Sequence, residues 1–134
     1  MKNKIILLLV LTFYSCLNNP KIPIPNTLEL ALRERYSEYV QLLNKAHARD
    51  TLALNAFLKI DYIHDSAGYD HGYILFQLIK VVGDDQFANV LKKIDCKTVE
   101  KVARYVEVGI DASDKDRKDL LQNYPKVTTI LHLR

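Results

Sequence analysis

Beyond residue 26, apolar positions recur every three or four residues along most of the chain, with charged positions between them. This spacing is the period of an amphipathic helix that buries one face. No stretch alternates polar and apolar residues as a half-buried strand does, so the pattern predicts an all-α fold. The expected helices cover residues 27–48, 51–64, 71–82, 84–94, 97–112 and 113–124.

The segment 71–82 predicts a helix without a polar face, because only Gln77 and Lys80 interrupt the apolar run that follows Gly72. A helix that is apolar nearly all round is buried. We therefore expect a compact bundle of about five to six helices with the helix near 71–82 at its centre. Gly83 suits the end of this helix, because glycine adopts a left-handed conformation without strain.

Short polar side chains that can cap helix amino termini precede the expected helices. They are Asn26 or Thr27, Asp50, Asp70, Asp84, and Ser113 or Asp114. Pro125 suits the first turn of a last helix, since that position needs no backbone N–H. The β-branched residues that follow Pro125 leave an extended segment as the alternative.

The start of the chain has a different pattern. Lys2 and Lys4 precede an apolar run that begins at Ile5 and stops before Asn18. A positive segment followed by an apolar one is the order of a secretory signal. The apolar run is too short to span a membrane as a helix, which needs about 20 apolar residues.

The apolar run ends in Phe13-Tyr14-Ser15-Cys16. Ser15 suits ordinary signal cleavage, but Phe13 does not, because the residue three before the cut must be small. The segment resembles the lipobox of bacterial lipoprotein precursors, in which a small residue precedes a cysteine. The resemblance covers residues 1–16 and implies that Cys16 is acylated and that the chain is cut before it. A signal anchor that stays uncut is the alternative.

This resemblance sets the expected organisation of the chain. Residues 1–15 would be the lipoprotein signal peptide, 16–26 the acylated cysteine with a proline-rich tether, and 27–134 a single helical domain. Two acyl chains are enough to hold a protein stably on a membrane. We therefore expect a lipid-anchored protein of the bacterial cell envelope, whose domain faces the periplasm or the exterior and whose first partner is the membrane.

Charge and cysteine content narrow the possible functions. The chain has 19 Lys and Arg against 16 Asp and Glu, and two of the lysines belong to the expected signal peptide. This near balance gives no reason to expect a nucleic-acid partner. If Cys16 is acylated, Cys96 has no partner in the chain for a disulfide or a cysteine-based zinc site. We expect Cys96 to be a small buried thiol, with an intermolecular disulfide as the alternative.

The richest polar cluster lies between residues 61 and 72. Its candidate ligand-binding or partner-binding side chains are His64, Asp65, Tyr69, Asp70 and His71. His and Asp are side chains that metal sites and acid–base sites use. A metal-dependent hydrolase would need further His and Asp from distant helices, and the segment keeps neither EF-hand nor HExxH spacing. The simpler interpretation is structural: Asp70 caps a helix, and its neighbours order a loop.

No GxSxG, P-loop or GxGxxG motif occurs, so we name no catalytic residue, no metal ligand and no cofactor. Eight tyrosines occur, seven of them after Cys16. They either rim the core or form a binding surface, where tyrosine is enriched. We expect a small envelope protein that binds a protein partner, as an immunity protein, an inhibitor or an accessory of an envelope complex. The alternative is a small metal-dependent hydrolase or ligand-binding protein that uses residues 61–72.

Overall fold

The computed structural model describes residues 19–134, so the expected signal peptide and Cys16 lie outside the described residues. Within that range the chain forms helices and no strand, which confirms the predicted all-α fold. The elements are α2 (Asn26–Leu32), the 3₁₀ turn η1 (Arg33–Arg35), α3 (Tyr36–His47), α4 (Thr51–Leu58), α5 (Ser66–Val82), α6 (Asp84–Leu91), α7 (Cys96–Gly109), α8 (Asp114–Asn123) and α9 (Pro125–Leu131). None of these helices has both the length and the apolar composition that a membrane span requires.

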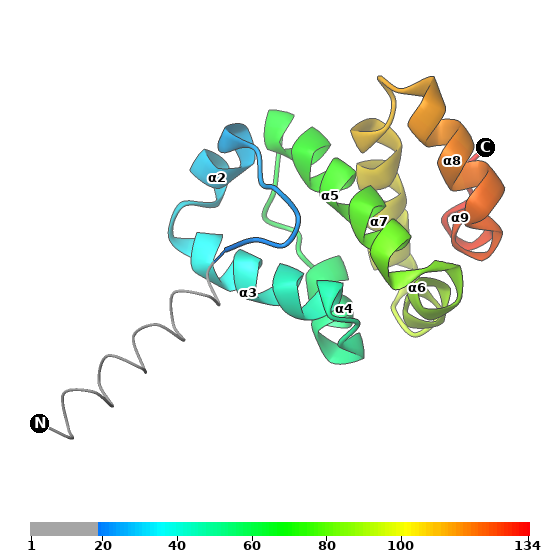
Figure 1. Cartoon of the computed structure of the whole chain (residues 1–134), viewed down its shortest axis with the longest axis horizontal. Helices are drawn as coiled ribbons and strands as arrows, with labels where there is room; N and C mark the ends of the chain where they lie inside the picture. The colour runs from blue at the N-terminus through cyan, green and yellow to red at the C-terminus, as the bar shows by residue number, and fades with distance from the viewer. Residues whose placement is uncertain (1–18) are drawn as a thin grey trace, which may run out of the picture.

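Helix α5 is the centre of the bundle, as the apolar segment 71–82 predicts. It crosses the middle of the molecule, with α2, α3 and α4 on one side and α7, α8 and α9 on the other (Figure 1). It packs against α2, α3, α6 and α7. Gly83 ends it with a φ of 90°, a conformation that side-chain-bearing residues rarely adopt.

The start of α5 differs from the prediction. The helix begins at Ser66, and Asp65 precedes it with a φ of 53° and no side-chain capping bond. The expected start of the helix at His71 and the expected cap at Asp70 are therefore wrong. Polar residues and Gly68 are typical of a loop. Here Gly68 and its neighbour Ala67 are buried in the core, so tertiary packing outweighs the local preference.

The expected helix over residues 27–48 is divided. Arg33 leaves the helical region with a φ of 49°, and η1 separates α2 from α3. Pro25 precedes α2 without a side-chain cap, so neither Asn26 nor Thr27 acts as predicted. The division lets α2 pack on α5 while α3 packs mainly on α4.

Three local predictions are confirmed. Asp50 caps α4 by accepting a hydrogen bond from the Ala53 N–H at 3.0 Å. Ser113 caps α8 by accepting one from the Asp116 N–H at 3.2 Å. Pro125 is the first residue of α9, so the β-branched residues after it are helical and not extended. The predicted helix over 51–64 ends early, at Leu58, and the irregular segment that follows buries Ile60 and Ile63 in the core.

Helices α5 and α7 approach each other closely at two glycines. A Cβ atom added to Gly72 would lie 1.8 Å from the Tyr105 carbonyl oxygen and 3.1 Å from the Gly109 Cα. A Cβ added to Gly109 would lie 2.3 Å from the Gly72 carbonyl carbon. Real Cβ atoms cannot occupy these positions, so the two helices cross with backbone against backbone.

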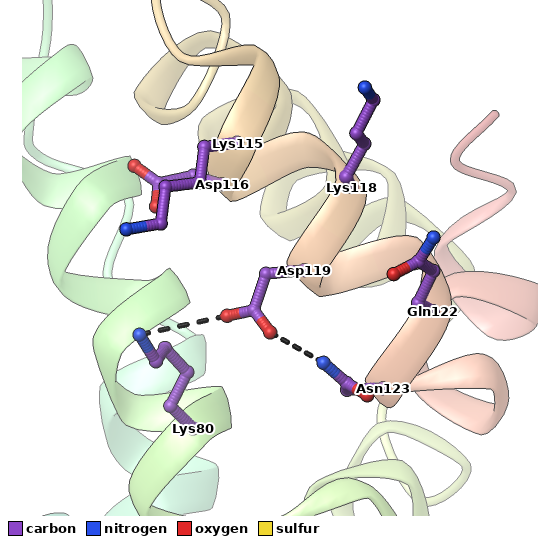
Figure 2. A pocket seen from close by; sticks show the side chains of 7 residues that line it. All are labelled: Lys80, Lys115, Asp116, Lys118, Asp119, Gln122 and Asn123. Carbon is purple, nitrogen blue, oxygen red and sulfur yellow. Dashed lines mark hydrogen bonds and ion pairs between the residues drawn. The ribbon is translucent and has the colours of Figure 1, made fainter.

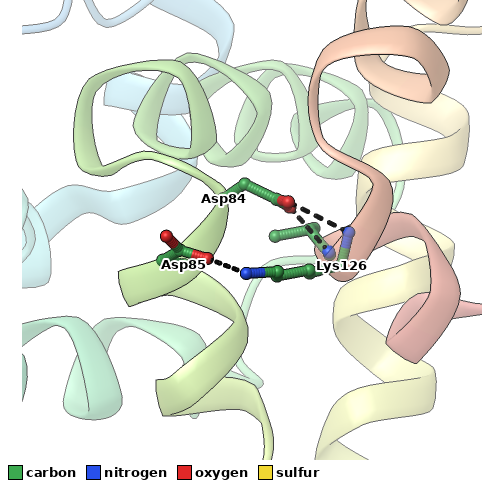
Figure 3. Close-up of polar contacts among 4 residues, drawn as sticks. Asp84, Asp85 and Lys126 are labelled. Atoms are coloured by element: carbon green, nitrogen blue, oxygen red, sulfur yellow. Dashed lines mark hydrogen bonds and ion pairs between the residues drawn. The ribbon is translucent and has the colours of Figure 1, made fainter.

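Asp84 caps a helix other than the predicted one. Its carboxylate does not cap α6, where Asp84 is the first residue. It accepts hydrogen bonds from the N–H groups of Lys126 at 3.1 Å and Val127 at 2.9 Å, in the first turn of α9 (Figure 3). Asp85 forms an exposed ion pair with the Lys126 ammonium beside this cap. A carboxylate of α6 thus provides the N-cap of a helix that starts 41 residues later.

We predict that Asp84→Ala lowers the free energy of unfolding by about 1 kcal/mol, because two N–H groups of α9 lose their acceptor. The matched control is Asp85→Ala, which removes only an exposed ion pair and should leave stability unchanged. Chemical denaturation of both variants measures the difference. Equal effects of the two substitutions would contradict the capping role of Asp84.

Candidate functional site

The cluster predicted from the sequence is divided between a surface groove and the core. His64, Asp65 and Tyr69 line a groove of about 380 Å³ beside the start of α5. Asp70 is half-buried and is not among the groove's lining residues. His71 is only 1% exposed and lies in the core. The five candidate side chains therefore do not share one site.

The opposite wall of the groove comes from α7, which sequence reasoning missed. Its lining residues there are Lys101, Arg104, Tyr105 and Val108. These residues lie about 40 positions from the predicted cluster, and no local motif marks them. They meet the cluster because α5 and α7 cross at Gly72 and Gly109. Gly72 and Gly109 are the one sequence signal of that crossing. Their role can be recognised only once it is known that α5 packs against α7.

Helix α7 also holds in place the irregular segment between α4 and α5, which contributes Asp61 and Ile63 to the lining of the groove. The Tyr105 hydroxyl donates a hydrogen bond to the Ile63 carbonyl oxygen at 2.6 Å. The Lys101 ammonium donates one to the Lys59 carbonyl oxygen at 3.2 Å. Partial burial, together with the nearby Asp61 carboxylate, raises the pKa of Tyr105. Tyr105 is thus a neutral donor that holds the segment, and the groove is shaped before any ligand arrives.

The surroundings of His71 are those of a core residue. The Tyr39 hydroxyl and His71 Nδ1 share a buried hydrogen bond of 2.8 Å. The imidazole ring lies 5.4 Å from the Phe57 ring and 4.8 Å from the Tyr105 ring, measured between centroids. Burial lowers the pKa of His71 to about 3, and the positive charge of Lys101 adds to this effect. At neutral pH the side chain is therefore an uncharged part of the core.

Two tyrosines of α5 are exposed beside the groove. Tyr69 is 53% exposed and Tyr73 is 42% exposed, on a helix whose other large side chains are mostly buried. They are four residues apart and therefore share one face of the helix. The remaining described tyrosines are fully buried (Tyr39) or half-buried (Tyr36, Tyr62, Tyr105 and Tyr124). Tyrosine is thus used both inside the core and on one surface.

A second groove, of about 640 Å³, lies between α5 and α8. The Lys80 ammonium reaches across it to the Asp119 carboxylate at 3.6 Å, and Asn123 donates to the same carboxylate at 2.6 Å (Figure 2). Lys118 points away from Lys80 in this view. Lys80, Asp119 and Asn123 are therefore paired with one another across this groove.

Among the described residues there is no cluster of metal ligands, and the one cysteine is exposed. No group of three or more His, Cys, Asp or Glu side chains among these residues could hold a metal ion. Cys96 is exposed, so the expectation of a buried thiol is wrong. Cys96 is the first residue of α7 and lies about 120° round the helix from the buried Val102. That position faces solvent.

Comparison of the chain with known protein families, with curated proteins and with solved structures finds no match.

Proposed function

We propose that this chain is a lipid-anchored protein of the bacterial cell envelope that binds a protein partner through one surface, the tyrosine face. The tyrosine face consists of Tyr69 and Tyr73 on α5, with the adjoining groove residues Lys101 and Arg104 on α7. The observation that carries the proposal is the exposure of both tyrosines on the most buried helix of the bundle. A helix that buries nearly all its large side chains but presents two aromatic rings has an unoccupied contact surface.

The composition of the tyrosine face favours a polypeptide as the partner. Tyrosine and arginine are enriched in the centres of protein interfaces, and both contribute strongly to binding. The groove carries both signs of charge, because its lining includes Asp61 and Asp65 as well as Lys101 and Arg104. A nucleic acid would require a surface of one sign. A polypeptide can match apolar, acidic and basic groups together.

The anchor part of the proposal rests on the sequence of residues 1–16 and their resemblance to lipoprotein precursors. A lipid anchor holds a domain at a membrane without a spanning helix. The function of such a domain is then carried out by its protein surface. Anchoring also raises the effective concentration of the domain near envelope partners, so a modest surface is sufficient for binding. Immunity, inhibition and support of an envelope complex are three roles that this arrangement serves.

We predict that a photoactivatable phenylalanine analogue at Tyr69 or at Tyr73 forms a discrete cross-link in intact cell envelopes, because both side chains lie on the proposed interface. The matched control position is Leu52 on α4, which is 83% exposed and lies outside the tyrosine face. Gel analysis and mass spectrometry identify the product. Absence of a cross-link from both tyrosine positions, or the same product from position 52, would contradict the proposal.

A further inference from the structure

The chain just after the proposed lipid attachment site is held against the domain by hydrogen bonds and by buried side chains. The Asn44 side chain on α3 donates a hydrogen bond to the Asn19 carbonyl oxygen at 2.9 Å and accepts one from the Lys21 N–H at 2.8 Å. Ile22 is only 6% exposed and belongs to the core, and Ile24 packs against the core. The range 16–26 was expected to be a tether. Its described part instead lies along the domain.

These contacts limit how far the domain can move from its lipid anchor. Asn19 is three positions after Cys16, and a fully extended chain over three residue steps spans about 10 Å. A free tether as far as Asn26 would span about 35 Å. A domain of this size has a radius of gyration of about 13 Å, so its own radius exceeds the 10 Å link. A link shorter than the domain's radius prevents the domain from turning over.

We infer that the side of the domain formed by α3 lies against the phospholipid headgroups and that the end formed by α8 and α9 points away from the membrane. This inference rests on the proposed acylation of Cys16. The described chain starts beside α3, and α8 and α9 lie at the opposite end of the long axis from α2 and α3 (Figure 1). The membrane-facing surface would include Asn44 and the exposed Lys21 and Lys45.

The charges near the link suit a headgroup surface. Lys21 is two residues after Asn19, and Lys45 is the residue after Asn44. Both side chains are exposed, and neither has an ion-pair partner among the described residues. Ammonium groups near a membrane are attracted to phosphate and to anionic lipids. Two lysines would not bind a membrane alone, but they favour one orientation of a domain that an acyl anchor already holds there.

The test places one spin label on the full-length, lipid-modified protein in vesicles of phosphatidylethanolamine and phosphatidylglycerol. The labelling sites are Lys45→Cys on α3 and Lys118→Cys on α8, both exposed lysines, each in a Cys96→Ser background. A small fraction of lipid carries nickel on its headgroup and speeds relaxation of nearby labels. We expect relaxation enhancement at position 45 to be about threefold or more that at position 118, because the link is only about 10 Å long.

A lengthened link provides the control. Twelve Gly and Ser residues inserted between Asn18 and Asn19 add a root-mean-square span of about 20 Å, which should bring the ratio of the two enhancements close to one. Mass spectrometry of the amino-terminal peptide reports the lipid on Cys16. Equal enhancement at both positions in lipid-bearing protein of native length would overturn the orientation alone. Protein that carries no lipid and stays in the soluble fraction would overturn the anchor as well.

Discussion

Gly72→Ala is expected to lower the free energy of unfolding by about 3 kcal/mol. The added Cβ would lie 1.8 Å from the Tyr105 carbonyl oxygen and 2.6 Å from its carbonyl carbon. Both are backbone atoms of α7, which cannot move aside as the end of a flexible side chain can. The two helices would have to separate, and the contact between α5 and α7 is the most extensive in the bundle. The better helix propensity of alanine recovers only about 1 kcal/mol.

Gly68→Ala is the matched control, one turn earlier on the same helix. A Cβ there would lie 3.5 Å from the nearest Tyr105 ring carbon, which is an ordinary van der Waals contact. We expect its stability to be unchanged or to rise by up to about 1 kcal/mol. Urea or guanidinium denaturation of the two variants gives the comparison. If the two substitutions have equal effects, α5 and α7 do not cross with backbone against backbone at Gly72.

The second large effect is a loss of stability in acid caused by His71. Its pKa falls from 6.5 to about 3 in the folded protein, because the buried ring cannot be solvated when it is charged. The unfolded chain binds a proton near pH 6.5, whereas the folded chain does not until about pH 3. The contribution of His71 to stability is therefore complete above pH 6.5 and is lost progressively as the pH falls to about 3.

The size of this effect follows from the shift in pKa. A change from 6.5 to about 3 corresponds to about 5 kcal/mol between the two ends of that range. This is comparable to the whole stability of a small domain, so we expect acid unfolding within the range. His71→Gln removes the titrating group and should flatten the dependence of unfolding free energy on pH between 6.5 and 3.

The matched control for the acid experiment is His64→Gln, the same substitution at an exposed position on the groove. The measurement is the midpoint of denaturant unfolding at a series of pH values, for both variants and the wild type. A profile for His71→Gln as steep as that of the wild type would show that His71 does not control acid stability.

The central part of the fold could be predicted from the sequence because its signals are local. The apolar run after Gly72 identifies the buried helix, Gly83 ends it, and Asp50 and Ser113 cap α4 and α8. Each of these features lies within a single stretch of about ten residues or fewer. The break at Arg33 and the early start of α5 depend on what the segment packs against. That packing cannot be inferred from the residues next to Arg33 or next to the start of α5.

The groove illustrates the same limit. His64, Asp65 and Tyr69 could be identified from the sequence, because polar and aromatic residues cluster there. His71 belongs to the same run but points into the core, since the helix begins at Ser66 and fixes which face each residue takes. The contribution of α7 depends on a crossing at two glycines far apart in the chain. A polar cluster in a sequence therefore does not tell which of its members share a site.

The affinity of the cross-linked partner for the tyrosine face tests the proposed binding role most directly. The comparison is between the wild-type domain and the double variant Tyr69→Ser/Tyr73→Ser, with Leu52→Ser as control. About half of each tyrosine side chain is covered, and the Tyr73 ring lies 6.1 Å from the Phe76 ring, so the affinities are compared well below the melting temperature of each variant. We predict that the double variant binds at least about tenfold more weakly, as expected for central aromatic contacts, and that the control binds normally. Equal affinities for the wild type and the double variant would contradict the proposed function.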